Sequence, residues 1–361
     1  MGGRALKEHG TVRVTSTVEA KVSSEVISVL SAKMLEAGLQ SFPRKVIAYR
    51  EKVDHGDIDI LVPDTLRDIT TPVQIAKMLE DFYGVPIPCV FHGQDEPDPS
   101  VVPTSSMISL AVPLESGGRV QVDLIWVKEA EMDYAQSYYN WNDLSNLMGV
   151  IGKKMGLKFG HKGLTMPVAY GDRYAGEVLI SRDFGASLEF LGYDSRRWAE
   201  GFDNLPQIFE FASSSRLFDP DLFLREFRNH SARAKERNRT TYSGFLDYLR
   251  TNEVPSNGVV WKAKREDYLE AILDAFPDAR PAYQAVMDEL ALKMVRRVRL
   301  NGALVHSITG LDRELLGHFI NDFKHHHGLA AFNEILDKGE EHLTDQIKVF
   351  QRCWVAPELA M

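Results

Sequence analysis

Length, composition and charge limit what this chain can be. Its 361 residues exceed the usual size of one hydrophobic core, and with 44% hydrophobic and 26% charged residues we expect a folded protein of two domains. The formal net charge of -9 argues against gripping nucleic acid by bulk electrostatics, and no apolar run reaches the ~20 residues of a membrane span. The two cysteines have no metal-ligand spacing and the start lacks the apolar core of a signal peptide, so a cytoplasmic setting is expected.

The first half of the chain alternates between helical and extended patterns. Its first helix is expected at residues 23–37, with Ser23 as a possible N-cap and Gly38 as the stop. The patterns that follow predict strands at 45–49 and 57–62, a helix near 72–83, a hairpin of 105–113 with 119–127, a helix near 142–155 and short extended pieces over 156–180.

From about residue 193 the pattern changes to helix after helix, with apolar periodicity at 219–235, 264–275, 282–298 and 311–325. This change predicts a soft domain boundary near 195–205. The expected fold is an α/β catalytic domain with a mixed sheet backed by helices, followed by an α-helical domain. Its expected parts are an N-terminal segment and helix (1–40), the catalytic domain (41–155), a small mixed subdomain (156–198) and the helical domain (199–361).

Three aspartates stand out in this pattern. Asp57 and Asp59 lie two residues apart in a predicted strand, where the side-chain period of two places both on one face. Two like charges side by side repel unless a cation lies between them, and hard carboxylate oxygens suit magnesium or manganese. Asp123 lies in a second predicted strand, on the face opposite its apolar side chains. A pair of aspartates alone is more often a surface feature, but a third one makes a platform that could bind two ions.

Several ordered motifs resemble one family. Residues 49–52 and 56–62 are similar to the metal-binding strand of the family X DNA polymerases, the group of polymerase beta, and its approach. Residues 122–125 resemble the strand that carries the third metal ligand. Residues 138–143 with Asn146 stand where the family carries its nucleotide-contacting tyrosine-phenylalanine motif, and further likeness over 156–192 extends the resemblance to roughly residues 42–195.

The resemblance implies a nucleotidyltransferase that uses two Mg2+ or Mn2+ ions and an NTP or dNTP. Asp57 and Asp59 would bind both ions, and Asp123 would bind the ion that activates an acceptor hydroxyl. The implied nucleotide-binding residues are Arg50, Lys52, Gly56, Tyr138, Asp143 and Asn146. The expected acceptor is a DNA or RNA 3′ end, with Arg228, Arg233 and Arg237 of a basic stretch as candidate contacts, although a solvated helix face is the simpler explanation of that stretch.

The sequence also departs from the family. The glycine-serine pair that cradles the triphosphate through backbone N-H groups is replaced by Val46 and Ile47, and the second half of the tyrosine motif by Asn140 and Trp141. The stretch ahead of the catalytic strand is short for the family's helix-hairpin-helix region, which makes gap filling on duplex DNA a weaker expectation.

Three alternatives therefore stay open. Glycine-punctuated helices near residues 301–320 faintly resemble tRNA nucleotidyltransferases, which keeps an RNA 3′-terminal nucleotidyltransferase among the candidates. A nucleic-acid-binding module that has lost its chemistry is the second. Transfer to a protein or a small molecule is the third.

Two histidine features favour a structural interpretation. The run His325, His326 and His327 spreads around a helix and cannot converge on one ion. His55 and His92 lie near strand ends by the expected site, where a hydrogen-bonded structural histidine is the simpler explanation. No phosphate-binding GxxxxGK[ST] loop occurs, so a P-loop NTPase is disfavoured.

Overall fold

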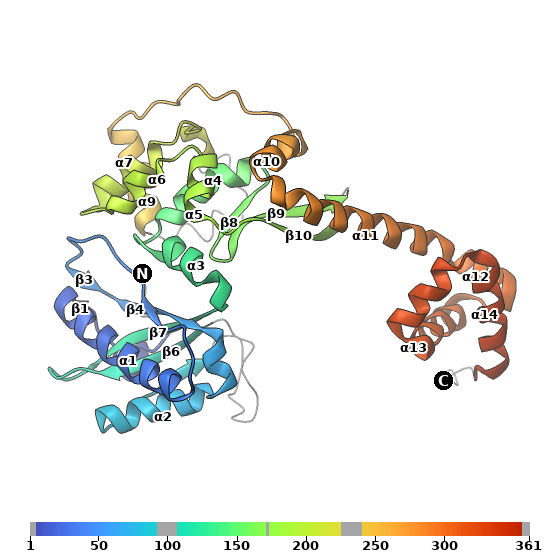
Figure 1. The fold of residues 1–361 in the computed structure, drawn as a ribbon, viewed down its shortest axis with the longest axis horizontal. Helices are drawn as coiled ribbons and strands as arrows, with labels where there is room; N and C mark the ends of the chain where they lie inside the picture. Colours follow the sequence, from blue (N-terminus) through green and yellow to red (C-terminus); the bar gives the residue numbers. More distant parts are fainter. Residues whose placement is uncertain (1–4, 92–106, 171–172, 225–239, 356–361) are drawn as a thin grey trace. The chain divides into compact units, whose positions relative to one another are not determined.

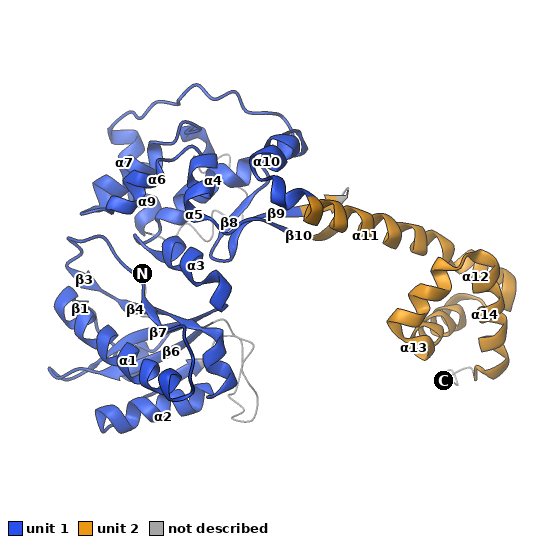
Figure 2. Ribbon diagram, viewed as in Figure 1, with its two compact units in different colours: residues 1–167, 177–280 blue, residues 168–176, 281–361 orange. Residues whose placement is uncertain are grey.

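The computed structural model describes residues 5–91, 107–170, 173–224 and 240–355 (Figure 1). Their contacts group the chain into two compact units, coloured separately in Figure 2. Unit 1 comprises residues 1–167 and 177–280, and unit 2 comprises residues 168–176 and 281–361. The division near residue 280 differs from the expected change of character at 195–205, which marks the end of the strands: the last strand among the described residues ends at Ser181. The finer domain limits stay a prediction.

The first helix, α1 (Ser16–Glu36), begins earlier than expected. Thr15 is its N-cap and accepts a hydrogen bond from the Val18 N-H at 3.4 Å. The expected cap, Ser23, is instead buried within the helix, where its Oγ donates to the Ala20 carbonyl. By contrast, α2 (Pro72–Tyr83) has the expected bounds, because a capping box starts it and Gly84 in the left-handed region ends it.

A mixed sheet of five strands forms the centre of unit 1. Its order is β2 (Arg44–Lys45), β4 (Asp57–Pro63), β7 (Arg119–Val127), β6 (Met107–Pro113) and β5 (Cys89–Phe91). Strands β4 and β7 pair in parallel, and the other neighbours are antiparallel. The mixed sheet and the β6-β7 hairpin are therefore confirmed.

The expected strand at 45–49 is wrong beyond Lys45. The Val46 N-H still donates to the Asp59 carbonyl at 3.0 Å, but the Ile47 N-H donates to the Asn140 side-chain oxygen at 2.9 Å. The side chain of Asn140, which follows helix α3 (Met132–Tyr139), thus replaces the sheet partner. The segment after Lys45 leaves the sheet as a consequence.

The two faces of the sheet are covered differently. On one face, the even-numbered apolar residues of β4 and β7, such as Ile58, Ile60 and Val122, pack with α1 and α2, which lie side by side in Figure 1. On the other face, Leu61 and Ile125 pack against α3 (Met132–Tyr139). This alternation follows from the side-chain period of a strand. Because β1 (Val14–Thr15) pairs with β3 (Asp54–His55), the N-terminal segment belongs to the same core.

The rest of unit 1 is mainly helical. A three-stranded sheet has the order β10 (Arg173–Ser181), β9 (Gly163–Tyr170) and β8 (Lys158–Gly160), and residues 168–176 at the β9-β10 connection are grouped with unit 2. The helices are α4 (Leu144–Lys154), α5 (Phe184–Phe190), α6 (Ser195–Glu200), α7 (Leu205–Ser213), α9 (Thr240–Thr251) and α10 (Leu269–Ala275). Of the helix expected at 219–235, a short 3-10 turn at Pro220–Leu222 is described, and residues 225–239 lie outside the described part.

Unit 2 contains four helices among its described residues: α11 (Arg280–Arg299, from residue 281), α12 (Gly302–Thr309), α13 (Arg313–Asp337) and α14 (Glu340–Cys353). Its core is separate and rich in phenylalanine, with Phe319, Phe323 and Phe350 in contact. Helix α13 is kinked at Gly328, which has φ 69° and ψ 162°. In the described part of the chain, no helix combines the length and the apolar surface needed to cross a membrane.

Candidate metal and nucleotide site

Asp57, Asp59 and Asp123 converge at one end of the sheet. The parallel pairing of β4 and β7 places Asp59 directly opposite Asp123, and Asp57 lies one strand period away on the same face. One oxygen from each carboxylate lies within 4.8 Å of the others. Helix α3 packs on the same face further along, over Leu61 and Ile125.

Asp123 is held in place by neighbours in its own sheet. It is 5% exposed. Ser109 on β6, directly opposite in the register, donates through Oγ to Asp123 Oδ1 at 2.5 Å. Gln121 Nε2 donates to both carboxylate oxygens, at 2.9 and 3.0 Å. These bonds fix the orientation of the third carboxylate without any metal ion.

The three carboxylates at this end of the sheet repel one another when they are ionised. Burial, followed by the negative charges of Asp57 and Asp123, raises the pKa of Asp59 to about 8. Magnesium binds oxygens at about 2.1 Å, so two ligands on opposite sides of one ion lie about 4.2 Å apart. A separation of up to 4.8 Å closes to that distance with small side-chain movements. The three residues could thus hold a metal ion.

The carboxylates border a pocket of about 750 Å³, which is within the usual range for ligand sites, about 300–1,000 Å³. The structure brings most of the predicted nucleotide-binding residues together there. Those lining the pocket are Lys52, Gly56, Tyr138, Asp143 and Asn146, together with the expected metal ligands Asp57 and Asp59. Asp143 accepts a hydrogen bond from Asn146 Nδ2 at 3.0 Å, so these two side chains support each other at the start of α4. Asp123 lies next to the pocket and is not one of its lining residues.

Lys52 is a cation whose charge opposes the rise in the pKa of Asp59. Burial lowers its pKa, while the negative charges of Asp57 and Asp59 oppose that shift. Its backbone carbonyl accepts a hydrogen bond from Ser16 Oγ, which also lies 3.2 Å from His55 Nε2. His55 is buried and lines the same pocket. His92 lies outside the described residues.

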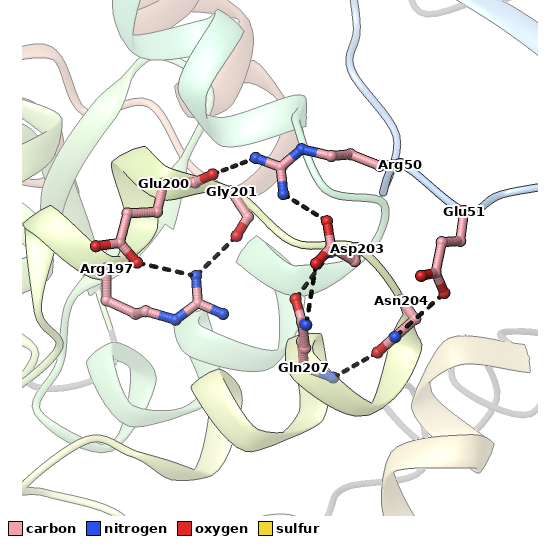
Figure 3. Close-up of polar contacts among 8 residues, drawn as sticks. All are labelled: Arg50, Glu51, Arg197, Glu200, Gly201, Asp203, Asn204 and Gln207. Atoms are coloured by element: carbon pink, nitrogen blue, oxygen red, sulfur yellow. Dashed lines mark hydrogen bonds and ion pairs between the residues drawn. The ribbon is translucent and has the colours of Figure 1, made fainter.

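Arg50, by contrast, points to a different partner (Figure 3). Its Nη1 donates to Asp203 Oδ1 at 2.7 Å, and its Nη2 donates to the Glu200 carbonyl. The Arg50 and Glu51 N-H groups donate to the carbonyls of Phe202 and Asp203, at 3.0 and 2.8 Å. Arg50 is not among the pocket residues, and in this structure it anchors the segment carrying Lys52 to the α6-α7 connection.

Among the comparisons with known proteins, solved structures show a similarity over part of the chain. No family model matches the chain, and no curated protein does. Among solved structures, the polymerase beta of Leishmania infantum in a ternary P/T complex is similar over 46% of this chain and 62% of its own, with 10% identity and a TM-score of 0.34. Over that segment the chain resembles polymerase beta. The chain covers less than two thirds of that polymerase.

The turn after Tyr138 and Tyr139 is held in an uncommon backbone conformation. Trp141 and Asn142 have φ values of 65° and 60°, in the left-handed region that side chains disfavour. Trp141 is 8% exposed and packs edge-on against Phe202 at 5.5 Å, which fixes the turn. Asn142 thereby lines the pocket.

Arg13 and His161 are among the pocket residues that sequence reasoning missed. Arg13 lines the pocket from the N-terminal segment and pairs with Asp54, and its position follows from the β1-β3 pairing, for which the sequence has no strong signal. His161 lines it from the β8-β9 turn and stacks on Tyr139, with ring centroids 5.7 Å apart. Burial lowers the pKa of His161, so its ring is neutral near pH 7.

The predicted nucleic-acid contacts cannot be placed. Arg228, Arg233 and Arg237 lie outside the described residues.

Proposed function

We propose that this protein is a metal-dependent nucleotidyltransferase, which moves a nucleoside monophosphate from an NTP or dNTP to an acceptor hydroxyl. The observation that carries the proposal is the convergence of Asp57, Asp59 and Asp123 within 4.8 Å at the edge of a pocket of about 750 Å³. Close packing of three aspartates without a cation is unfavourable, because each ionised carboxylate raises the free energy of the ionised form of its neighbours.

In this mechanism Asp57 and Asp59 would hold two Mg2+ or Mn2+ ions, and Asp123 would help to hold the ion on the acceptor side. When bound, the ions would lower the pKa of the attacking hydroxyl and offset charge on the leaving group. The acceptor hydroxyl releases its proton to water as its oxygen forms a bond to the α-phosphorus, the bond from that phosphorus to the α-β bridging oxygen breaks, and pyrophosphate leaves. Ser109 and Gln121 keep Asp123 aligned throughout.

The chain's own cations contribute to holding the triphosphate. Lys52 and Arg13 line the pocket. Arg50, expected from the family resemblance to neutralise the triphosphate, would first have to leave Asp203. Tyr138, Asp143 and Asn146 line the part of the pocket assigned to the base and sugar, with Gly56 before the metal strand.

Asp59→Asn tests the proposal. It should abolish Mg2+-dependent incorporation of labelled nucleotide, because one ligand of both ions is lost. The melting temperature should stay equal or rise, since a buried carboxylate near two others is removed. Asp68→Asn, at an exposed position after β4, is the matched control and should leave incorporation unchanged. Unaltered incorporation in Asp59→Asn would refute the assignment.

One observation favours a second candidate, a binding module that kept the platform and lost the transfer step. The Ile47 N-H, at the place of the family's phosphate-binding pair, is already bonded to Asn140. Calorimetric titration with nucleotide and Mg2+ separates the two candidates, because such a module should show little triphosphate affinity. Incubation with each labelled NTP and dNTP, with DNA, RNA or cell extract, would then identify the acceptor: a DNA 3′ end, an RNA 3′ end, a protein or a small molecule.

A further inference from the structure

Unit 1 contains a second cavity, of about 350 Å³, beside the first. Tyr138 and Asn146 line both cavities. One wall of the second is a face of α4, where Ser145, Gly149 and Lys153 follow each other at helical spacing. Its volume is at the lower end of the range for ligand sites, about 300–1,000 Å³, and is enough for one nucleotide-sized molecule.

The two cavities have opposite charge. The first is lined by five carboxylates, from Glu19, Asp54, Asp57, Asp59 and Asp143, against two cationic side chains, those of Arg13 and Lys52, so negative charge is in excess. The second is lined by the cationic side chains of Lys153, Lys158 and Arg265 and by no carboxylate. Lys158 is ion-paired at 3.1 Å with Glu177, which is not a lining residue. A phosphate without a bound metal ion should therefore be repelled by the first cavity and attracted by the second.

A buried hydroxyl in the second cavity has no partner. Ser145 is 1% exposed, and its Oγ makes no hydrogen bond in the structure. Such a group destabilises a folded protein unless something bonds to it. A ligand could accept a hydrogen bond from the Ser145 hydroxyl. The missing partner of this hydroxyl is an observation independent of the three cations.

The remaining wall suits a flat ring. Tyr138 and Phe159 lie edge to face with centroids 5.7 Å apart, and Leu157 and Val150 add apolar surface. Gly149 has no side chain to fill the space, and a Cβ there would meet Phe159 at 3.6 Å. The cavity thus combines an apolar, aromatic wall with a cationic one.

We propose that this second cavity binds one phosphorylated nucleoside, with its phosphate among Lys153, Lys158 and Arg265 and its base along Tyr138 and Phe159. The proposal rests on the proposed function for its biological role. Tyr138 and Asn146 would then lie between the nucleotide in the first cavity and the one in the second. The ligand is a free nucleotide or one unit of a strand, which share the same chemistry.

The first experiment is calorimetric titration of the full chain in EDTA, so that the carboxylate pocket holds no metal ion. The probes are a nucleoside monophosphate, the same nucleoside without phosphate, inorganic phosphate, and a single-stranded tetranucleotide. We expect one site for the monophosphate, at least about tenfold tighter than for the nucleoside or phosphate alone. Binding of the tetranucleotide alone, with the variant dependence given below, also supports the site and assigns the ligand to a strand. Absence of binding by both, or phosphate binding as tightly as the nucleotide, would overturn the proposal.

Matched variants locate the site. Lys153→Met and Arg265→Met keep the apolar stems and remove the charges, and each should weaken binding about tenfold. The neighbouring Lys154 is not a lining residue, so Lys154→Met should leave the affinity unchanged. Equal affinity in all three variants would place the ligand elsewhere.

Ser145→Ala separates a ligand role from a structural one. It removes an unpartnered buried hydroxyl, so the melting temperature should stay equal or rise while the nucleotide affinity falls about fivefold or more. A lower melting temperature with unchanged affinity would contradict the proposal. Asp59→Asn should retain this EDTA-resistant binding even though it loses incorporation, so that failure of this site and failure of the proposed function are seen separately.

Discussion

At the residue scale, Asp59 shows how position changes the chemistry of an ordinary side chain. Its pKa is raised from 3.8 to about 8 by burial and by Asp57 and Asp123, whereas Lys52 acts in the opposite direction. Between these two values the folded, metal-free protein holds a proton that the unfolded chain has released. The contribution of Asp59 to stability is therefore lost as the pH rises from about 4 through 8.

This shift predicts a pH-dependent response to magnesium. Below pH 8 the ion must displace a proton from Asp59, and above pH 8 it meets an ionised site that repels itself. Saturating Mg2+ should consequently raise the melting temperature more at pH 8.5 than at pH 6, as measured by thermal denaturation. Asp59→Asn should show a much smaller shift at both pH values, and an equal shift in the unchanged protein would count against the site.

Residue-scale expectations succeeded where a local period was sufficient. The alternation of side chains along a strand is fixed by the backbone. The shared face of Asp57 and Asp59, and the position of Asp123 on the face opposite the even-numbered apolar residues of its strand, were therefore predictable. The partner of Arg50 was not, because Asp203 is far away in the sequence and only the α6-α7 connection brings it close.

At the element scale, packing decided what local pattern could not. The turn of Trp141 and Asn142 is compatible with many conformations, and its left-handed backbone is fixed by contacts with Phe202 and by the Trp141 N-H bond to the Ile47 carbonyl at 2.7 Å. The same contacts remove Ile47 from the expected strand. The periodicity of a sequence does not show whether a backbone N-H, such as that of Ile47, bonds to a neighbouring strand or to a side chain such as that of Asn140.

Gly201 should be the most sensitive position supporting this turn. It has φ 76°, and a Cβ there would lie 2.5 Å from Trp141 Cη2. Gly201→Ala should lower the free energy of unfolding by about 1–2 kcal/mol for the left-handed backbone and by about 1–3 kcal/mol more for the clash. Gly38→Ala is the control, with φ 74° and no atom within 4 Å, and should show the backbone effect alone in chemical denaturation. Equal losses at the two positions would disprove the packing role.

At the scale of the whole molecule, the described residues of the two units bury separate groups of apolar side chains. The core of unit 1 joins α1, α2 and the central sheet, and that of unit 2 is built from α12, α13 and α14. Since each unit buries its own apolar residues, each should respond separately to a core substitution.

Phe323→Ala tests this separation. Phe323 is 1% exposed in the core of unit 2, and its truncation should lower the stability of that unit by about 3–5 kcal/mol. Calorimetric unfolding of the full chain should then show an earlier transition that Mg2+ does not shift, while the Mg2+-responsive transition keeps its position. A single transition that moves as a whole would contradict independent units.

The sequence by itself determined the local features: the bounds of α2, the β6-β7 hairpin, the mixed α/β character and the common face of the aspartates. Capping groups, turn residues and the strand period all act within a few residues, so they can be read without the fold. Tertiary structure alone decided the partner of Arg50, the placement of Arg13 and His161, the division near residue 280 and the second cavity. Each of these features depends on contacts between residues distant in sequence. Such contacts stabilise the fold only after the chain has folded and the loops between the contacting residues have closed.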